Sequence, residues 1–269
     1  ATVVLVARTV EKLDETLAEI AEQGGTAKAY SCDVSDLADC DKLVARVLKG
    51  HGKVDVLINN AGRSIRRSVR YSYDRFHDFE RTMQLNYFGA LRLILGFLPA
   101  MEEQRGGQII NISSIGVLTS PPRFSSYVAS KAALDAFSAC AAPEYAADNI
   151  DFTTIHMPLV RTPMIAPTGL YKAFPTLSPE QARDLVMKAI VGKPKRVSTG
   201  LGVAGAVAQA TMPSVTEAFL SQAYALFPDS AAARGLTEEE AAREKAALPS
   251  SRLALAQKLF AQVWRGVHW

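Results

Sequence analysis

Tyr127 and Lys131 stand four residues apart in the stretch YVASK, and these two residue types can share one chemical task. The alanine- and leucine-rich residues that follow predict a helix, which would place both side chains on one face. There a lysine ammonium favours a nearby phenolate, so it lowers the pKa of the tyrosine from its usual value of about 10. A tyrosine tuned in this way can donate a proton near neutral pH. The same spacing also occurs on ordinary surface helices, so its meaning depends on the surrounding elements.

The composition is typical of a water-soluble globular protein. Of the 269 residues, 48% are hydrophobic and 21% are charged, which is enough to bury a core. The net charge of +3 is too small to favour a nucleic acid as partner. Cys32, Cys40 and Cys140 are odd in number and lack metal-ligand spacing, so we expect neither a disulfide framework nor a metal site. The pattern of a secretory signal is not evident, and the cytoplasm is the expected location.

Strand and helix patterns alternate along the chain. Continuous apolar runs predict strands, and apolar residues that recur every three or four positions predict helices. The expected strands are Val3–Ala7, Ala27–Cys32, Val54–Ile58, Gln108–Ile112 and Phe152–His156, and the expected helices are 10–23, Leu37–Leu48, Phe76–Met101 and Ser126–Ala147. This alternation predicts an α/β fold with a doubly wound parallel sheet. We expect residues 1–200 to form that domain, and residues 201–269 to form a helical extension packed on it or on a partner.

Small, polar or cationic residues follow nearly every expected strand. The residues at these strand ends are Arg8, Asp33, Asn59 to Gly62, Ser113, Ser114 and Pro158. Ligands of open α/β sheets bind beyond the carboxyl ends of the strands. The sequence therefore predicts a nucleotide and a polar reaction centre at this edge of the sheet.

Taken together and in order, these residues resemble the short-chain dehydrogenase/reductase family, a Rossmann-fold group of nicotinamide-dependent oxidoreductases. The resemblance covers most of the chain, from about Thr2 to Thr162. It rests on NNAG at residues 59–62, on Asn86 in QLNYFG, on Ser114 thirteen residues before Tyr127, and on YVASK.

The resemblance implies that Asn86, Ser114, Tyr127 and Lys131 are catalytic. Tyr127 would give its proton to the oxygen of a carbonyl that receives a hydride. Lys131 would lower the pKa of that tyrosine and bind the nicotinamide ribose. Ser114 would hydrogen-bond the carbonyl, and Asn86 would hold a proton-relay water.

The end of the first strand bears on the choice of cofactor. An acid there binds the ribose hydroxyls of NAD, whereas the extra phosphate of NADP needs a cation and no carboxylate. Ala7 occupies the place of the acid and Arg8 follows it, so NADPH is the expected cofactor. The alternative is that Arg8 is an ordinary surface residue. The other cofactor contacts implied by the resemblance are Asp33, Val34, Asn59, Ala61, Gly62, Tyr127, Lys131, Pro158, Val160 and Thr162.

The sequence also departs from the family pattern. The glycine-rich turn that carries a pyrophosphate onto a helix N-terminus is absent, together with its strand and helix. We expect that a first βα unit is missing from the given sequence, because the catalytic residues are intact. The alternative is a domain that has lost catalysis. A second departure is Pro158-Leu159, where the family has Pro-Gly.

Further stretches resemble the short-chain-type, C-terminal domain of bacterial fatty acyl-CoA reductases, which stands alone or follows another reductase domain. They are RSIRRSVR at residues 63–70, PLVRTPMIAPT at 158–168, FPTLSPEQA at 174–182, FPDSAAARG at 227–235 and RGVHW at 265–269. Guanidinium groups bind phosphates with paired donors, so Arg63, Arg66 and Arg67 are candidates for the phosphates of coenzyme A. The alternative is a solvated arginine face.

The expected function is therefore NADPH-dependent reduction of fatty acyl-CoA thioesters to fatty aldehydes. One alternative is a general alcohol dehydrogenase or ketoreductase on another carbonyl, and another is a non-catalytic nucleotide-binding domain. We expect a homo-oligomer or one part of a longer two-domain reductase. An amphipathic stripe at residues 259–267 is expected to pack on the domain or a dimer partner, with shallow attachment to a bilayer as the alternative.

Overall fold

The computed structural model describes residues 1–162, 176–226, 229–237 and 240. Its strands are β1 (Thr2–Ala7), β2 (Thr26–Ser31), β3 (Val56–Asn59), β4 (Gly107–Ser114), β5 (Ile150–Met157) and β6 (Arg196–Ser198). Its helices are α1 (Val10–Glu22), α2 (Leu37–His51), α3 (Phe76–Met83), α4 (Ala90–Glu103), α5 (Ile115–Thr119), α6 (Ser125–Glu144), α7 (Pro179–Gly192), α8 (Gly200–Thr211), α9 (Pro213–Leu226) and α10 (Ala231–Arg234). Short turns η1 (Val69–Tyr71), η2 (Gln84–Gly89) and η3 (Ala146–Asp148) complete the described elements. The expected alternation of strands and helices is confirmed.

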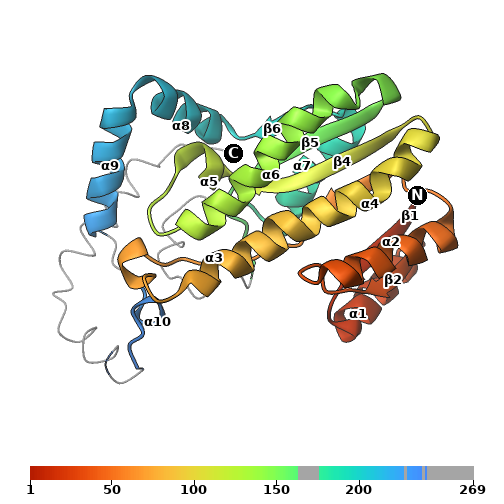
Figure 1. Cartoon of the computed structure of the whole chain (residues 1–269), viewed down its shortest axis with the longest axis horizontal. Helices are drawn as coiled ribbons and strands as arrows, with labels where there is room; N and C mark the ends of the chain where they lie inside the picture. Colours follow the sequence, from red (N-terminus) through yellow and green to blue (C-terminus); the bar gives the residue numbers. More distant parts are fainter. Residues whose placement is uncertain (163–175, 227–228, 238–239, 241–269) are drawn as a thin grey trace.

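All described strand pairs are parallel, and helices cover both faces of the larger sheet (Figure 1). The strand order is β3-β4-β5-β6 in this sheet, and β1 and β2 form a separate pair. Alternate residues of β4 show why two layers form. Ile109 packs in the core beneath α4 and α6, whereas Ile110 and Ile112 pack on the other side with α7. The predicted α/β fold with a doubly wound parallel sheet is therefore confirmed.

β1 and β3 are edge strands that leave apolar side chains exposed. Among the described strands, β1 has β2 as its one partner, and β3 has β4. Val3 and Val6 on β1 and Val56 and Ile58 on β3 are 37–43% exposed. Parallel strands are usually covered on every side, so these apolar side chains are unusual. The expected missing βα unit is not tested by this observation and stays a prediction.

The long helix predicted from Phe76 to Met101 is interrupted by a π-helical turn. This turn, η2, lies between α3 and α4 and carries Asn86. π-turns inside α-helices occur frequently at functional sites. The turn lies tightly against the loop after β2, because a Cβ atom added at Gly89 would be only 2.1 Å from the Val34 carbonyl oxygen. Periodicity alone could not reveal this interruption, since the apolar pattern continues through it.

We predict that Gly89→Ala destabilises the fold. The added methyl group would meet backbone atoms of Val34 and could not be accommodated by a side-chain rotation. Overpacking of this kind costs about 1–3 kcal/mol, measured as a lower free energy of unfolding in urea. Gly200→Ala is the matched control, because nothing lies within 4 Å of the Cβ position there. Equal stability of the two variants would contradict the prediction.

The part of the chain after β6 contacts the sheet domain through a buried ion pair. Arg123, in the loop before α6, donates from Nε to Asp229 Oδ2 at 3.0 Å, and both side chains are at most 6% exposed. The same guanidinium lies 4.1 Å from the ring centroid of Tyr224 on α9. The division at residue 200 stays a prediction, and the stripe at 259–267 lies outside the described residues. Among the residues described, no helix combines the length and apolarity needed to cross a membrane.

Candidate active site

Helix α6 brings Tyr127 to the carboxyl end of β4. The side chain of Ser114, the last residue of that strand, lies close enough to the phenol of Tyr127 to lower its pKa. Ser114 is itself fixed, because its Oγ accepts a hydrogen bond from the Gly116 backbone nitrogen at 3.0 Å and caps α5. The serine and tyrosine that were predicted to act together are therefore in contact.

Lys131 lies one helical turn after Tyr127 and is 4% exposed. Its Nζ donates a hydrogen bond to the Ile112 carbonyl oxygen at 2.7 Å. Burial lowers the pKa of Lys131 to about 8, and the nearby carboxylate of Asp135 opposes that shift. The ammonium of this lysine thus begins to lose its proton close to the physiological range.

Asn86 ties the loop after β3 to helix α6. Its Oδ1 accepts from the Arg63 backbone nitrogen at 2.8 Å, and its Nδ2 donates to the Arg63 carbonyl oxygen and to Ser130 Oγ, both at 2.9 Å. A Cβ atom at Gly62 would lie 3.4 Å from both Asn86 Oδ1 and Lys131 Nζ. All four predicted catalytic residues therefore gather at the carboxyl ends of β3 and β4. The proposed relay water at Asn86 stays a prediction, since its amide is already bonded within the protein.

The pKa of Tyr127 differs from the sequence-based expectation. Burial raises the pKa of this phenol, the hydrogen bond from Ser114 lowers it in part, and the charge of Asp135 raises it further. The expected lowering by Lys131 is therefore wrong for this arrangement, and the ammonium points instead to the Ile112 carbonyl. A raised pKa keeps the phenol protonated at neutral pH, which is the form that can donate a proton.

Arg8 and Asp33 stand together at the carboxyl ends of β1 and β2. Their closest charged atoms are 3.6 Å apart, and the side chains are 63% and 40% exposed. Asp33 Oδ1 also accepts hydrogen bonds from the backbone nitrogen and hydroxyl of Ser35, which lower the pKa of Asp33. An accessible guanidinium thus lies at the strand end where we predicted a cation for the extra phosphate of NADP.

The other predicted cofactor contacts differ in their accessibility. Asn59 is 6% exposed and its Nδ2 donates to Asn111 Oδ1 at 2.8 Å, so its side chain joins β3 to β4 instead of facing a ligand. Any contact of Asn59 with a cofactor would therefore be made by its backbone atoms. The remaining predicted contacts are Val34 and Pro158, which are buried, Gly62, Val160 and Thr162, which are partly buried, and Ala61, which is exposed.

The three arginines predicted to bind coenzyme A have different surroundings. Arg67 Nε donates to Asp78 Oδ2 at 3.2 Å, and its Nη1 donates to the Ala233 carbonyl oxygen. This arginine is therefore committed to joining α3 and α10, which argues against its predicted phosphate contact. Arg63 and Arg66 are partly exposed, and for them the contact stays a prediction.

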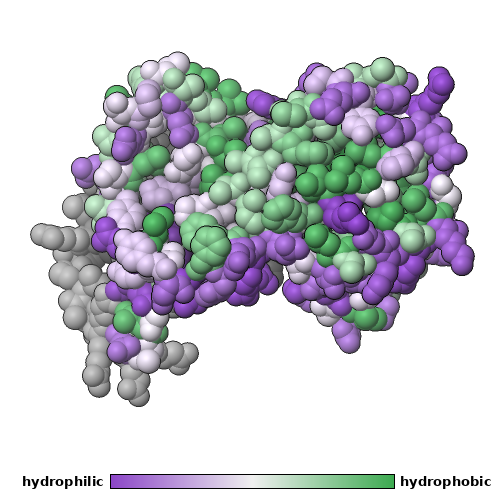
Figure 2. Space-filling model, in the orientation of Figure 1, coloured by the Kyte–Doolittle hydropathy of each residue, from purple (hydrophilic) through white to green (hydrophobic). Residues whose placement is uncertain are grey.

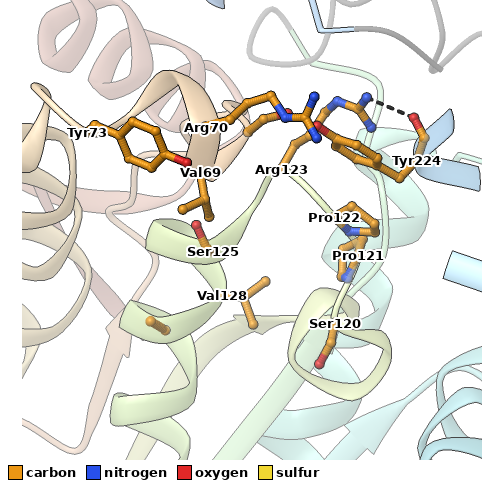
Figure 3. Close-up of a pocket in the computed structure, with 12 residues that line it drawn as sticks. Val69, Arg70, Tyr73, Ser120, Pro121, Pro122, Arg123, Ser125, Val128 and Tyr224 are labelled. Carbon is orange, nitrogen blue, oxygen red and sulfur yellow. Dashed lines mark hydrogen bonds between the residues drawn. The ribbon is translucent and has the colours of Figure 1, made fainter. Parts of the chain in front are cut away.

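A cavity of about 680 Å³ lies beside the start of α6 (Figure 3). The loop after β3, the loop before α6 and α9 line it with Val69, Tyr73, Pro122 and Tyr224 among others. Figure 3 shows two arginines near Tyr224, and their guanidinium carbons lie 5.4 Å (Arg70) and 4.1 Å (Arg123) from its ring centroid. A second cavity of about 500 Å³ shares Ser120, Pro122 and Tyr224 with the first. Sequence reasoning missed this space, although the arginine-rich stretch at 63–70 indicated its general place.

Comparisons with known proteins agree with this geometry. The sequence profile described as short chain dehydrogenase matches residues 1–170. A fatty acyl-CoA reductase of Acinetobacter baylyi is 53% identical over 99% of this chain and 86% of its own length. A fatty acyl-CoA reductase of Mycobacterium tuberculosis is 46% identical over 76% of this chain and 70% of its own length. The crystal structure of a short-chain dehydrogenase from Streptomyces avermitilis, 30% identical, superposes with a TM-score of 0.69 over 82% of this chain and 86% of its own.

Proposed function

The chain belongs to the short-chain dehydrogenase family, and on that premise we propose that it reduces fatty acyl-CoA thioesters to fatty aldehydes with NADPH. The observation that carries this proposal is the similarity to a fatty acyl-CoA reductase along 99% of this chain. The contact between Tyr127 and Ser114 beside the buried Lys131 supports the same chemistry. Family membership alone supports a nicotinamide-dependent oxidoreductase, so the substrate class and the NADPH preference are the proposed steps.

Ser114 and Tyr127 have defined parts in the proposed reaction, and the ammonium of Lys131 would bind the nicotinamide ribose of the cofactor. Bound NADPH supplies a hydride to the carbonyl carbon of the substrate. Ser114 donates a hydrogen bond that orients the carbonyl oxygen, and Tyr127 gives that oxygen a proton. The thioester then becomes a hemithioacetal, which breaks down to an aldehyde and free coenzyme A. Burial keeps Tyr127 protonated, which suits reduction over the reverse reaction.

The test is a coupled assay of the full-length protein with palmitoyl-CoA and NADPH. We expect loss of NADPH absorbance and release of thiol in equal amounts. NADPH loss with aldehydes or ketones but none with palmitoyl-CoA would favour a general carbonyl reductase. Cofactor binding without turnover of any of these carbonyl substrates would favour a nucleotide-binding domain without catalysis.

Arg8 supports the choice of NADPH over NADH. Its exposed guanidinium at the end of β1 can form charge-assisted hydrogen bonds to the phosphate that distinguishes the two cofactors. We predict that Arg8→Ala raises KM for NADPH about tenfold to a hundredfold and leaves KM for NADH nearly unchanged. Arg183→Ala is the control, since this exposed arginine pairs with Asp184 on α7. An equal rise in KM for both cofactors would show that Arg8 does not bind the phosphate that distinguishes them.

The two neighbouring cavities supply the proposed space for the acyl chain. Their walls include Val69, Pro122 and Leu220, which are apolar, and α9 forms one side. Arg70 is exposed near the rim of the first cavity and carries a positive charge that suits an anionic substrate such as an acyl-CoA. Here the helical extension would serve as part of the substrate site.

A second copy of the chain is the proposed protein partner. Figure 2 shows apolar side chains in a band across the face that carries α4 and α6. Two large apolar side chains of η2 and α4 are exposed, Phe88 at 44% and Leu95 at 49%. Large exposed apolar surfaces commonly mark association sites. Light scattering of the purified protein tests this, and a monomer at micromolar concentration would contradict it.

A further inference from the structure

Near Lys131 lies a hydrogen-bonded group of three side chains that the proposed reaction does not use, of which one is buried and two are partly buried. His156 on β5 faces Ser198 on β6, with 2.8 Å between His156 Nδ1 and Ser198 Oγ. The other ring nitrogen, Nε2, lies 2.9 Å from Asp135 Oδ2 on α6. His156 is 4% exposed and the side chain of Asp135 is 16% exposed. These contacts therefore connect the last strand of the sheet to the helix that carries Tyr127 and Lys131.

The hydrogen-bonding partners fix the orientation of the imidazole. A carboxylate only accepts hydrogen bonds, so Nε2 of His156 must carry a hydrogen and donate it to Asp135. On the other side of the ring, the hydroxyl of Ser198 lies within hydrogen-bond distance of Nδ1. Asp135 is thus held in place by an imidazole whose two nitrogens both have a partner.

This arrangement distinguishes Asp135, which is partly buried, from the buried acids described. Asp78 is paired with Arg67 and Arg75, and Asp229 is paired with Arg123, so nearby guanidinium groups balance those charges. Asp135 has no such neighbour within salt-bridge distance among the described residues, and its second oxygen, Oδ1, is buried without a hydrogen-bond partner there. Asp135 therefore differs from those two acids in being held by an imidazole instead of a guanidinium.

Lys131 is the cation on which the charge of Asp135 acts. Asp135 follows Lys131 by four residues on α6, so the two side chains lie on the same face of the helix. The other groups around Lys131 are Tyr127 on α6, Asn86 on η2 and the carbonyl of Ile112 on β4, with His156 and Ser198 behind Asp135. Asp135 is the acid of this set, and its charge raises the pKa of Lys131 against the lowering caused by burial.

We propose that Asp135 is a positioning residue whose carboxylate, oriented by His156 and Ser198, keeps Lys131 in the ammonium form that the site needs. The importance of that ammonium rests on the proposed function, because Lys131 is the cation of the catalytic set. Asp135 itself touches neither substrate nor cofactor in this scheme. It acts through Lys131, much as outer carboxylates orient the ligands of catalytic centres.

The test measures the protonation of Lys131 directly, without any substrate. The full-length protein is labelled with isotopes at its lysine side chains, and the Lys131 signal is assigned by its absence in Lys131→Arg. In the unmodified protein this signal should titrate at about 8. We expect Asp135→Asn to shift the titration at least about one unit lower, as removal of a nearby opposite charge does. Asp151→Asn, which removes an exposed acid paired with Lys193, should leave it unchanged.

A second variant separates this role from simple support of the fold. His156→Gln retains an amide that can donate to Asp135. Lys131 should therefore titrate at the same pH in this variant as in the unmodified protein, even if the variant is less stable. An unchanged Lys131 titration in Asp135→Asn would overturn the proposal. If the palmitoyl-CoA assay shows turnover, the alkaline limb of its pH profile should move down with the Lys131 titration. If that assay shows none, the proposed function fails while the titration still decides the role of Asp135.

Discussion

Replacement of Tyr127 by phenylalanine is expected to lower kcat for the reduction of palmitoyl-CoA by about 10²–10⁴, the usual contribution of a positioned general acid. The change removes one oxygen atom and leaves the ring that packs beside Phe124. The hydroxyl of Ser114 would lose its partner at the carbonyl site but would remain held by the Gly116 backbone nitrogen. The binding surface therefore persists while the proton donor is lost, and KM should change much less than kcat.

Tyr145→Phe provides the matched control for this prediction. Tyr145 lies at the end of α6, beside the first residue of β5 instead of the carboxyl ends of the strands, and its ring packs against Phe152. Stopped-flow measurement of a single turnover would show whether the chemical step itself is slowed. If Tyr127→Phe retained most of the activity, as Tyr145→Phe should, another group would have to supply the proton.

The sequence allowed the fold, and the edge of the sheet where the candidate catalytic residues gather, to be predicted because both depend on local patterns. Apolar runs marked the strands, and the residues after each strand marked the edge of the sheet where ligands bind. The contacts of Ser114 with Tyr127, and of Asn86 with the helix of Lys131, confirm that residues distant in sequence meet at that edge. Another local pattern, the capping box formed by Ser178 and Gln181, begins α7.

Features that depend on packing between elements could not be predicted in this way. The π-turn at Asn86 follows from the close approach of Gly89 to the loop after β2, which no local pattern encodes. The sequence suggested that Arg67 could bind a phosphate. Its guanidinium instead donates a hydrogen bond to Asp78, eleven residues later. The direction of the Tyr127 pKa shift depended on how deeply the phenol is buried. Asp135 had a visible signal, its spacing of four from Lys131, but its histidine partner comes from a distant strand.

Lys131→Met is expected to abolish activity and at the same time to stabilise the fold at neutral pH. Burial lowers the pKa of Lys131 from 10.5 to about 8, so the folded state binds its proton less tightly than the unfolded state. Below pH 8 both states are protonated and the folded protein carries the full cost of a buried ammonium. Between about pH 8 and 10.5 that cost declines as the pH rises, and above this range it is gone. A functional residue that is costly to the fold is a common trade-off.

The size of the gain follows from two opposing effects. The lowered pKa of Lys131 corresponds to a burial cost of about 3 kcal/mol, which the substitution removes. Loss of the hydrogen bond to the Ile112 carbonyl offsets about 1 kcal/mol of that gain. We therefore expect Lys131→Met to raise the free energy of unfolding by about 2 kcal/mol at pH 7, measured by urea denaturation, and by much less at pH 10. Lys193→Met, which removes an exposed lysine paired with Asp151, should change it by less than about 0.5 kcal/mol at pH 7. A loss of stability in Lys131→Met at pH 7 would mean that the contacts of the ammonium outweigh its burial, and the catalytic lysine would then also be a structural one.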